Sequence, residues 1–480
     1  MSTSTPAASA ASTAATDPAI AGSSFSRLSL PPAMLANLAQ LGYVEMTPIQ
    51  AATLPLTLAG HDLIAQARTG SGKTVAFALA LLAPLQPRRF ETQALVMCPT
   101  RELADQVTGE IRRVARGEDN VKVLSLCGGT TIRGQVASLA HGAHVVVGTP
   151  GRLLDHLQRG SLKVDALRTL VLDEADRMLD MGFFDDIANV IRQCPAARQT
   201  LLFSATYPEE IGKLSRQFLR TPREVRLQAG HAAGAIRQRF FEVTSDQRLH
   251  AVTLLLNHYR PVSSLAFCNT KQQCRDLVSV LRGHGFHALE LHGDLEQRDR
   301  DQVLIQFANR SCSVLVATDV AARGLDITQL AAVINVDIAQ DPEIHVHRIG
   351  RTGRADEAGW AFSLASLEEM ARIARIEDMQ KSEAEWHPLS GLRPARPEPL
   401  LPPMVTVQLL GGRKEKIRPG DVLGALTGEA RYAATQIGKI NVTDFATYVA
   451  VDRDIGRQLV ERLSSVRIKG KSVKARLMQD

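Results

Sequence analysis

Short apolar runs alternate with helix-like stretches along most of the chain. In the first half the strand-like runs are residues 63–65, 94–98, 121–125, 144–147, 170–172 and 199–203. In the second half they are residues 264–268, 288–291, 313–317, 332–335 and 360–363. Strands that are apolar along their whole length and separated by helices are typical of a parallel sheet covered on both faces. The pattern therefore predicts two α/β domains in tandem, residues 25–227 and 228–387, joined by a Gly/Ala-rich connector near residues 228–236.

A different pattern follows these two domains. Residues 388–403 hold six prolines, a density that opposes both helix and sheet and predicts a semi-extended linker. After it, strand-like runs at 405–410, 437–442, 447–451 and 473–478 enclose helix-like runs at 419–426 and 455–463. This βαββαβ order predicts a small α+β domain at residues 404–480, similar to an RNA-recognition motif. Residues 1–24 are mostly Ala, Ser and Thr and predict a disordered tail.

Charge is distributed unevenly along the 480 residues. Residues 401–480 contain 14 Lys and Arg against 8 Asp and Glu, so this segment carries the whole net charge of +6. A concentrated basic module indicates a polyanionic partner, nucleic acid first, and a solvated basic face is the alternative. No apolar stretch approaches the ~20 residues of a membrane span, no secretory signal is evident, and the six cysteines show no CxxC spacing. We expect a cytoplasmic protein with reduced, buried thiols and no membrane partner.

Residues 67–74 carry the first chemical signal. A strand, a glycine-rich turn and a helix in this order direct backbone N–H groups at one point, which favours a phosphate. The candidate phosphate-binding residues are Thr69, Gly70, Ser71, Gly72, Lys73 and Thr74. Lys73 would contact the β/γ-phosphates of a nucleotide, and the Thr74 hydroxyl would bind Mg²⁺. Ala67 stands where the strict Walker A pattern has a glycine, so a flexible turn is the alternative.

Two further segments complete a predicted nucleotide site. The apolar run 170–172 ends in Asp173 and Glu174, at the sheet edge where open α/β folds bind ligands. There Asp173 would bind Mg²⁺ and Glu174 would activate the attacking water. Arg351 and Arg354 are three residues apart, which would place both on one helical turn as arginine fingers. A plain acidic strand end and a surface helix of paired charges are the alternatives.

These segments resemble the DEAD-box RNA helicases of superfamily 2, and the resemblance spans residues 25–365. The literal sequence 173–176, Asp-Glu-Ala-Asp, is the signature of that family. Phe25 and residues 42–50 match its adenine-reading motif, which implies that Gln50 binds the adenine edge and that Phe25 or Tyr43 stacks on the ring. Residues 323–326 match a motif in which Asp326, beside Gly324, contacts the ribose. The implied cofactors are ATP and Mg²⁺.

The same resemblance implies RNA-contacting and coupling residues. Its RNA-backbone motifs match at Pro99, Thr100, Arg101, Gly129, Thr149, Gly151, Arg152, Thr270, Gly293, Arg298 and Thr318. The residues implied to couple hydrolysis to strand separation are Asp176, Ser204, Thr206 and His347. His345 departs from the family pattern, because many members carry tyrosine there, and we expect this to alter local packing.

The tail resembles the C-terminal domain of the DbpA subgroup, through residues 412–428, 437–440 and 468–471. This resemblance implies binding to a hairpin of 23S ribosomal RNA and a role in assembly of the 50S subunit. The basic clusters that suit phosphate contacts are Arg413, Lys414, Lys416 and Arg418, and then Lys469, Lys471 and Lys474. Residues 447–451 lack the aromatic positions of a base-stacking central strand, so we do not expect bases to stack on this sheet.

The leading hypothesis is an RNA-stimulated ATPase that unwinds short RNA duplexes as a monomer. Its two lobes would share one ATP. An ATP-gated RNA clamp or annealing factor uses the same residues and is the main alternative. A translocating DNA helicase is a third hypothesis, disfavoured by the motifs.

Overall fold

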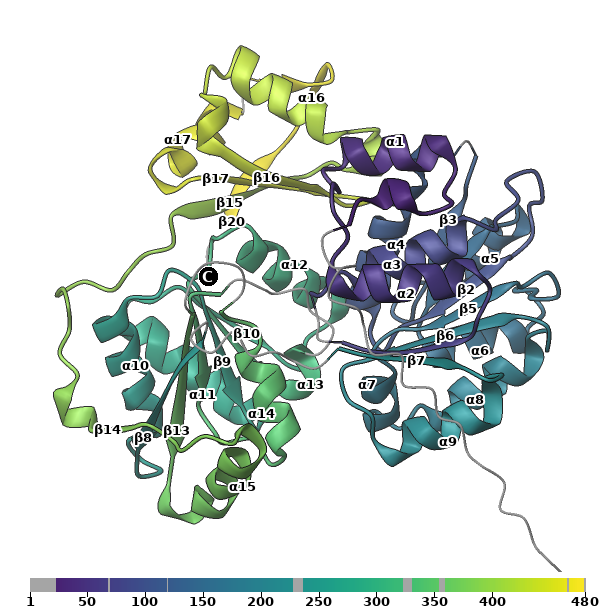
Figure 1. The fold of residues 1–480 in the computed structure, drawn as a ribbon. Coiled ribbons are helices and arrows are strands. Elements are labelled where there is room, and N and C mark those ends of the chain that lie inside the picture. Colours follow the sequence, from purple (N-terminus) through teal and green to yellow (C-terminus); the bar gives the residue numbers. More distant parts are fainter. Residues whose placement is uncertain are drawn as a thin grey trace, which may run out of the picture. The chain divides into compact units, whose positions relative to one another are not determined.

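The chain divides into two compact units, one within residues 1–230 and one within residues 231–480. In this computed structural model, residues 23–67, 70–118, 120–227, 236–322, 330–353, 359–463 and 466–478 are described (Figure 1). The expected N-terminal tail (up to residue 22) and most of the 228–236 connector therefore lie outside the described residues. Within the described parts of the chain, no helix is both long and apolar enough to cross a bilayer. All six cysteines are buried thiols.

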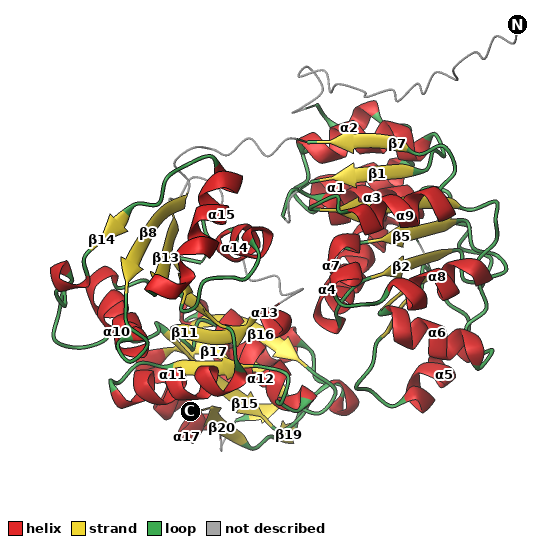
Figure 2. Ribbon diagram, turned by 90° about the horizontal axis from the view of Figure 1, so that it is seen from below, coloured by secondary structure: helices red, strands yellow, loops and turns green. Residues whose placement is uncertain are grey.

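The first unit is built on a seven-stranded parallel sheet in the order β3-β4-β2-β5-β6-β1-β7 (Figure 2). Its strands are β1 (Leu63–Gln66), β2 (Ala94–Met97), β3 (Val123–Leu126), β4 (Val145–Gly148), β5 (Thr169–Leu172), β6 (Gln199–Ser204) and β7 (Arg223–Arg226). Its helices are α1 (Pro32–Gln40), α2 (Pro48–Leu58), α3 (Lys73–Leu82), α4 (Arg101–Val114), α5 (Ile132–Ala140), α6 (Pro150–Gln158), α7 (Ala175–Asp180), α8 (Phe184–Gln193) and α9 (Glu209–Phe218). Leu63 and Ala65 face the core formed with α1–α4, whereas Ile64 faces the core formed with α6–α9. Both faces of the sheet are thus covered, as a fully apolar parallel sheet requires.

The second unit contains another seven-stranded parallel sheet, in the order β10-β11-β9-β12-β13-β8-β14. Its strands are β8 (Ile236–Glu242), β9 (Ser264–Cys268), β10 (Ala288–Leu291), β11 (Val314–Thr318), β12 (Ala332–Asn335), β13 (Gly359–Ala365) and β14 (Trp386–His387). Its helices are α10 (Arg248–Tyr259), α11 (Lys271–Gly283), α12 (Gln297–Ala308), α13 (Asp319–Ala322), α14 (Pro342–Ile349) and α15 (Met370–Gln380). The expected fold of two tandem RecA-like sheets is confirmed.

The same unit ends in a small antiparallel sheet in the order β16-β17-β15-β20, here called the tail domain (residues 404–478). Its elements are β15 (Met404–Leu409), α16 (Pro419–Gly424), β16 (Ile437–Val442), β17 (Thr447–Asp452), α17 (Gly456–Leu463), β18 (Arg467–Ile468), β19 (Lys471–Ser472) and β20 (Ala475–Met478). A separate hydrophobic core joins one face of the sheet to the two helices. The predicted small α+β domain is therefore confirmed.

Several local predictions differ from the structure. The inner strand β8 and the short strands β7, β14, β18 and β19 were not predicted, because polar or very short strands leave little apolar signal. The strand expected at 121–125 lies at 123–126, and the helix expected at 419–426 is α16 followed by a wider turn to Glu429. Ser24 was expected in the disordered tail, but it pairs with Glu45 and caps the turn that begins at Phe25.

His345 lies fully buried on α14 and stacks on the Phe240 ring at 6.2 Å. Its Nε2 lies 3.3 Å from Gln238 Oε1, while its Nδ1 has no hydrogen-bond partner. Burial, assisted by the Arg348 charge, lowers the pKa of His345 to about 4. The folded protein therefore holds a neutral imidazole where the unfolded chain takes up a proton below pH ~6.5.

We predict that this imidazole makes the protein less stable in acid. A folded pKa below the unfolded value gives stability that is complete above pH ~6.5 and is lost as the pH falls toward 4. The expected loss from this group between pH 7.5 and pH 5 is about 2 kcal/mol. His345→Phe should remove that component from the pH dependence of urea unfolding, whereas replacement of the exposed His61 should not. An unchanged pH dependence in His345→Phe would contradict the buried neutral state.

Candidate functional site

Three loops meet along one edge of the first sheet. Residues 67–74 follow β1, residues 173–176 follow β5 and residues 204–206 end β6, and these three strands are neighbours in the order β5-β6-β1. Because the strands are parallel, their carboxyl ends lie at the same edge. The structure thus brings together three segments that are far apart in the sequence.

The turn after β1 ends at Gly72, directly before α3. Gly72 caps α3 with φ of +94°, which favours glycine, and a Cβ there would lie 2.7 Å from Gln50 Nε2. Gln50 donates from Nε2 to Gly72 O at 3.1 Å, so the predicted adenine-reading residue is fixed to this loop. Lys73 is buried and donates from Nζ to Ala67 O at 2.8 Å. Thr69 lies outside the described residues.

The two aromatic candidates for adenine stacking have other partners in this structure. Phe25 is 3% exposed and belongs to the core formed with α1–α4. Tyr43 donates its hydroxyl to Glu110 Oε1 at 2.6 Å. Burial, together with this hydrogen bond, raises the pKa of Tyr43 to about 12. Their contact with an adenine ring stays a prediction.

The acid pair after β5 is buried and conformationally strained. Asp173 donates its backbone N–H to Met97 O on β2 at 3.0 Å, which fixes the pair to the neighbouring strand. Glu174 is only 7% exposed and adopts φ of +51°, a region that costs a non-glycine residue about 1–3 kcal/mol. Its Oε2 accepts no hydrogen bond and has an ion-pair contact with Arg177 Nε at 3.6 Å. A strained backbone that holds an unsatisfied carboxylate oxygen is typical of a functional site.

Asp173 fits the role of a residue that binds a divalent cation. Burial raises the pKa of its carboxyl to about 7; Lys73 opposes this shift and Glu174 adds to it. A buried carboxyl of this kind is ionised when a cation lies beside it, and carboxylate and hydroxyl oxygens are the ligands that Mg²⁺ prefers. Asp173 and Thr74 would hold that ion, and the ion would neutralise phosphate charge.

The third loop is hydrogen-bonded to the acidic segment. Asp176 Oδ2 accepts from the backbone N–H groups of Ala205 (3.1 Å) and Thr206 (2.9 Å) and from the Thr206 hydroxyl (2.9 Å). Ser204 donates from Oγ to Thr206 O at 2.7 Å. Three of the four residues predicted to couple hydrolysis to unwinding therefore form one network. The fourth, His347, lies on α14 in the other unit.

The RNA-contact candidates of the first unit lie at the other half of the same sheet edge. Thr100 follows β2 and caps α4 by accepting from Leu103 N–H at 3.3 Å. Gly129 follows β3 with φ of +74°, and a Cβ there would overlap the guanidinium of Arg101. Arg152, on the helix after β4, donates from Nη1 to Gln135 Oε1 at 2.8 Å. Because β3, β4 and β2 are neighbours, the predicted residues form one row beside the nucleotide loops. This row also includes Pro99, Thr149 and Gly151.

The second unit repeats this arrangement. Thr270 follows β9 and caps α11 by accepting from Gln273 N–H at 3.1 Å. Gly293 follows β10, Arg298 is the second residue of α12, and Thr318 ends β11. These strands are neighbours in the order β10-β11-β9, the counterpart of β3-β4-β2. The candidate RNA residues thus occupy equivalent edges of both sheets.

The helix that precedes the predicted arginine fingers is shorter than expected. α14 ends at Ile349, and Arg351 lies buried in the turn beyond it. The prediction that Arg351 and Arg354 share a helical turn is therefore wrong for Arg351, because Gly350 ends the helix. Arg354, Gly324 and Asp326 lie outside the described residues.

Arg348 anchors the end of α14. Its guanidinium makes two 2.7 Å bonds to the Asp319 carboxylate, donates to Asp337 O at 2.7 Å and lies 5.0 Å from the centroid of the Phe267 ring. It also donates to Asn269 Oδ1 at 3.3 Å, so it connects the loops after β9, β11 and β12. Arg348 was not predicted from the sequence, although it lies between the predicted residues His347 and Arg351.

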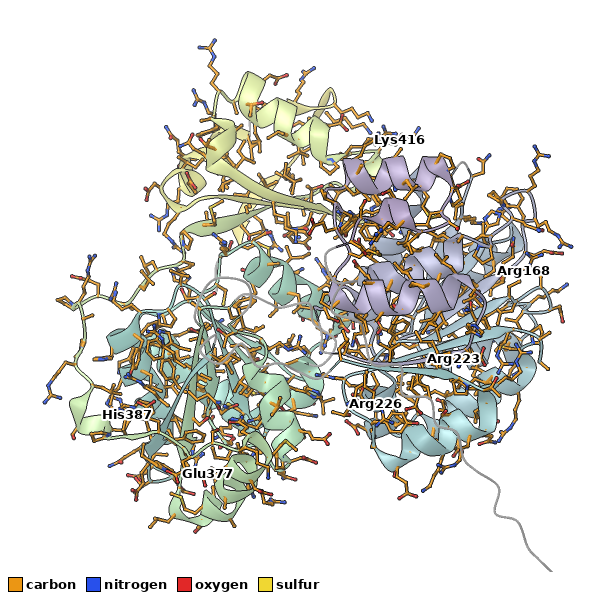
Figure 3. All side chains as sticks on the ribbon, in the orientation of Figure 1. Arg168, Arg223, Arg226, Glu377, His387 and Lys416 are labelled. Carbon is orange, nitrogen blue, oxygen red and sulfur yellow. The ribbon has the colours of Figure 1, made fainter. Side chains whose placement is uncertain are left out.

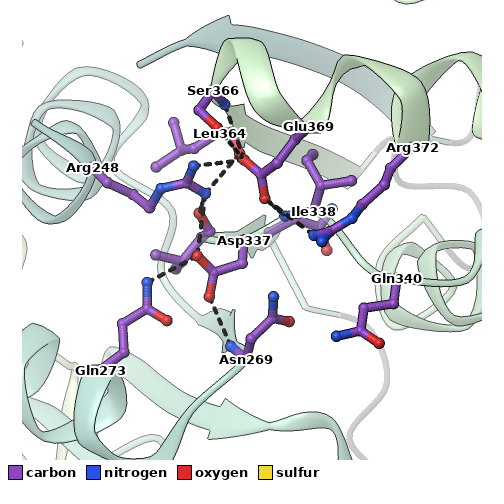
Figure 4. Close-up of polar contacts among 12 residues, drawn as sticks. Arg248, Asn269, Gln273, Asp337, Ile338, Gln340, Leu364, Ser366, Glu369 and Arg372 are labelled. Atoms are coloured by element: carbon purple, nitrogen blue, oxygen red, sulfur yellow. Dashed lines mark hydrogen bonds and ion pairs between the residues drawn. The ribbon is translucent and has the colours of Figure 1, made fainter. Parts of the chain in front are cut away.

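A second buried arginine contacts Asp337 in the same group of loops (Figure 4). Arg248 binds Glu369 at 2.6 Å and Asp337 at 3.2 Å. Asp337 Oδ2 accepts from Asn269 N–H at 2.8 Å, and Asp337 Oδ1 accepts from Gln273 at 2.9 Å. Together with Arg348, this network fixes the turn that leads to Thr270. Removing one partner of such a buried ion pair usually costs about 3–5 kcal/mol.

The two basic clusters of the tail domain adjoin in the structure. Lys469 donates from Nζ to Lys416 O at 2.8 Å, and Lys416, labelled in Figure 3, precedes α16. Lys414 lies 4.2 Å from the centroid of the Phe445 ring, which is 65% exposed. Phe445 was missed because aromatic residues were sought on the central strand and not in the β16–β17 loop. A cationic surface with an exposed aromatic side chain suits a nucleic acid.

Comparisons with known proteins agree with this architecture. Residues 47–214 match the DEAD/DEAH box helicase family, residues 247–356 the helicase conserved C-terminal domain and residues 406–477 the DbpA RNA binding domain. The chain belongs to the DEAD-box ATP-dependent RNA helicases.

Among its relatives, ATP-dependent RNA helicase DbpA of Escherichia coli (strain K12) is 52% identical over 452 residues, which cover 94% of this chain and 98% of that protein. ATP-dependent RNA helicase CshA of Listeria monocytogenes is 43% identical over 362 residues, which cover 75% of this chain and 69% of CshA. The structure of S. cerevisiae Dbp5 bound to RNA and ADP BeF3 superposes with a TM-score of 0.70 at 30% identity, covering 76% of this chain and 96% of that one. The resemblance to the DbpA subgroup is thereby confirmed.

Proposed function

We propose that this ATP-dependent RNA helicase opens short duplexes beside a hairpin of 23S ribosomal RNA, held by its tail domain, during assembly of the 50S subunit. The observation that carries this proposal is the junction of the two basic clusters on the tail domain, next to the exposed Phe445 ring. The likeness of the tail to the DbpA RNA binding domain supports it.

The residues of the first unit would perform hydrolysis. The loop at Gly70–Thr74 would bind the phosphates, with Lys73 adding positive charge. Mg²⁺ held by Asp173 and Thr74 would stabilise the negative charge that develops on the phosphates. Glu174, whose Oε2 is without a hydrogen bond, would orient the attacking water and accept its proton.

The second unit would supply positive charge to the phosphates of ATP. Arg351 and Arg354 would stabilise the transition state as arginine fingers when RNA and ATP are both bound. When the two units close on ATP and RNA, the RNA bound along the carboxyl edges of both sheets would be bent. Loss of phosphate would then release the RNA. Product release would limit turnover, as in many enzymes with a closing step.

The decisive experiment measures ATPase stimulation by fragments that tile ribosomal RNA. One fragment of 23S RNA should stimulate far more strongly than the others. Deletion of residues 404–480 should leave the basal ATPase rate unchanged. All fragments should then stimulate the ATPase to the same extent. Preference that survives the deletion would place specificity in the two RecA-like domains.

A charge variant tests the same surface in the full chain. Lys414→Glu with Lys416→Glu should weaken binding of the preferred fragment and lower the log–log salt slope by about 2, since each phosphate contact contributes about 0.9. Lys381→Glu, an exposed change on the second RecA-like domain, is the matched control. An unchanged salt slope would contradict phosphate contacts at this cluster.

The second candidate function is an ATP-gated clamp that does not unwind. This function is favoured by the predicted RNA-contacting residues along both sheet edges, because the same residues would serve a clamp as well as they would serve unwinding. A duplex-displacement assay separates the two functions. Repeated strand release that continues at the same rate with a non-hydrolysable nucleotide would favour the clamp.

A further inference from the structure

Arginines gather at the amino edge of the first sheet, where its strands begin, opposite the nucleotide loops at the carboxyl edge. Arg168 directly precedes β5, and Arg198 directly precedes β6. Arg223 is the first residue of β7, and Arg89 lies in the segment that leads into β2. Because the strands are neighbours in the order β2-β5-β6-β1-β7, these arginines follow one another along the edge. Figure 3 labels Arg168 and Arg223 there, apart from Arg226 at the other end of β7.

The second sheet begins with different residues. Ser263 precedes β9, Ser313 precedes β11 and Ala331 precedes β12. Both sheets are parallel and have seven strands, so this fold does not require arginines where its strands begin. The basic amino edge is therefore a property of the first domain in particular.

Backbone hydrogen bonds hold the arginines in line. Arg168 donates its N–H to Gln93 O at 2.8 Å, and Arg168 O accepts from Gln199 N–H at 2.7 Å. Gln93 also donates from Nε2 to Arg89 O at 2.9 Å. The chain at Arg89 is thus joined to the start of β2, and Arg168 is joined to the strands on both sides of β5.

The buried acid of this edge is used by the backbone. Asp62 is 4% exposed, and its two carboxylate oxygens accept from Thr200 N–H at 2.8 Å and from Arg220 N–H at 2.7 Å. Asp62 thereby fixes the loop that carries Arg220 before β7. Its side chain forms no ion pair with the arginines in the part of the chain that the structure describes.

Four of the arginines are exposed and are called the amino-edge arginines: Arg89, Arg168, Arg220 and Arg223. Among the described residues, the last three form no ion pair with a carboxylate. Arg89 Nε lies 3.7 Å from Glu91 Oε2, and both side chains are more than half exposed, so this pair contributes little. The positive charge of the edge is therefore available to an anionic partner.

Arg198 adds charge from inside the edge. It is only 7% exposed, and its Nη1 donates to Pro195 O at 2.8 Å. Its Nε has no hydrogen-bond partner in the structure, and no carboxylate pairs with its guanidinium among the described residues. A buried cation without a paired anion raises the positive potential around it. Arg198 has a structural role, but its charge adds to the attraction of an anion to this edge.

An exposed aromatic ring lies beside the charge. Phe90 follows Arg89 in the chain and is 54% exposed, and its ring packs on His144 with the centroids 4.8 Å apart. Charge alone would suit an acidic protein as well as a nucleic acid. An exposed ring next to arginines favours single-stranded RNA, because bases stack on the ring while the guanidinium groups bind phosphates.

We propose that Phe90 and the amino-edge arginines bind a single-stranded segment of RNA, separate from the RNA at the carboxyl edge. Strands lie ~4.8 Å apart, so the four steps from β2 to β7 span roughly 19 Å, which accommodates several nucleotides. Each central strand has at least four residues, which separates the two edges by about 13 Å or more. The same nucleotides therefore cannot occupy both edges, and the second segment is RNA that flanks the duplex.

This site would keep flanking RNA on the first domain while the duplex at the carboxyl edge is opened and released. It requires only that the chain binds RNA, and it is independent of the ribosomal hairpin proposed for the tail domain. The tests below therefore use RNA without 23S sequence, and a failure of the proposed hairpin would leave their results unchanged.

Cleavage of bound RNA locates the segment. All six native cysteines are buried, so an iron chelate attached to Ala197→Cys, at an exposed position beside Arg198, reports on RNA at the amino edge of the full chain. The probe is an RNA duplex with a long single-stranded extension. Cleavage should be confined to a few nucleotides of the extension, and Arg168→Glu with Arg223→Glu should abolish it. Cleavage that is absent, or that survives the double substitution, would overturn the proposal.

Affinity measures the contribution of the arginines. Arg168→Glu with Arg223→Glu should weaken binding of the extended RNA by about tenfold and lower the log–log salt slope by about 1.4, since each phosphate contact on a single strand contributes about 0.7. Binding of the same duplex with a short extension should be unchanged. Lys381→Glu with Arg396→Glu, at exposed positions of the second unit, makes the same change in net charge and should alter neither affinity.

Kinetics separate this site from the catalytic machinery. In the double variant the extended RNA should stimulate the ATPase to the same kcat, with a KM for RNA about tenfold higher. Equal affinities and equal KM values in the variant and the unsubstituted protein would overturn the proposal and assign the arginines to an acidic protein. A loss that the control pair reproduces would also overturn it.

A second variant guards against a folding defect. Phe90→Ala leaves every arginine in place and should weaken binding of the extended RNA by about fivefold or more through lost stacking. Thermal unfolding shows whether each variant is folded. If the double variant is not, the prediction for Phe90→Ala decides, and an unchanged affinity in folded Phe90→Ala would overturn the proposal.

Discussion

Replacement of Arg351 by alanine should lower the RNA-stimulated ATPase rate by about 10³-fold or more. An arginine finger raises the rate of phosphoryl transfer by about 10³–10⁵-fold, because its positive charge stabilises the negative charge that develops in the transition state. The local structure supports a fixed role: Arg351 is buried in the turn after α14, and its carbonyl accepts from Leu330 N–H at 3.2 Å. Steady-state hydrolysis with saturating RNA measures the effect.

Two controls separate loss of chemistry from loss of structure. Arg351→Lys keeps a positive charge but not the two-pronged geometry, so it should recover only a small part of the rate. Binding of ATP should weaken much less than hydrolysis in both variants. If hydrolysis in Arg351→Ala falls less than tenfold while the protein is folded, Arg351 is not an arginine finger.

Glu174→Gln should lower hydrolysis by about 10²–10⁴-fold, the usual contribution of a general base, and leave ATP and RNA binding intact. The amide has nearly the same shape as the carboxylate but cannot accept the proton of the attacking water. The variant should therefore accumulate as a complex with ATP and RNA. Single-turnover hydrolysis measures the rate, and RNA retention in the presence of ATP measures the trapped complex.

Because the backbone at Glu174 is strained, the same acid-to-amide substitution at a nearby acidic residue is a useful control for effects on local structure. Asp180→Asn, at the end of α7, alters an acidic residue outside the three loops and should leave hydrolysis within twofold of normal. Unchanged ATPase in Glu174→Gln would remove this residue from its proposed role. The strain at φ of +51° would then need another explanation.

Most strands of the two large sheets could be predicted from the sequence, but β7, β8 and β14 could not. Strands 264–268, 288–291 and 332–335 were predicted with the bounds that the structure gives, because most of their residues are apolar. The edge strands and β8 were missed for the converse reason, since β7 has three charged residues and a single buried valine and the first half of β8 is also rich in polar residues. Helix ends were less well predicted: α14 ends at Ile349, and Gly350 was the local signal of that end, although the prediction carried the helical turn on to Arg351 and Arg354.

The site could be predicted as a set of residues but not as a network. Lys73, Asp173 and Glu174 follow from motifs whose chemistry is readable. The hydrogen bond from Gln50 to the Gly72 carbonyl and the bonds that link Asp176 to Thr206 depend on tertiary placement. The buried hydrogen bonds of Thr406 with Asn309 and Ser311 could not be predicted either, because a buried threonine on a sheet face looks the same in sequence as an exposed one.

The hydrogen bond from Asp173 N–H to the Met97 carbonyl joins the strand that leads to the nucleotide loop with the strand that leads to Thr100. Ligands at the two loops are therefore separated by one peptide contact and a few residues of rigid strand. If bound ATP strengthens RNA binding through this contact, bound RNA must strengthen ATP binding by the same free energy. A substitution that loosens this contact should weaken both affinities together, and neither ligand should be able to compensate for the other.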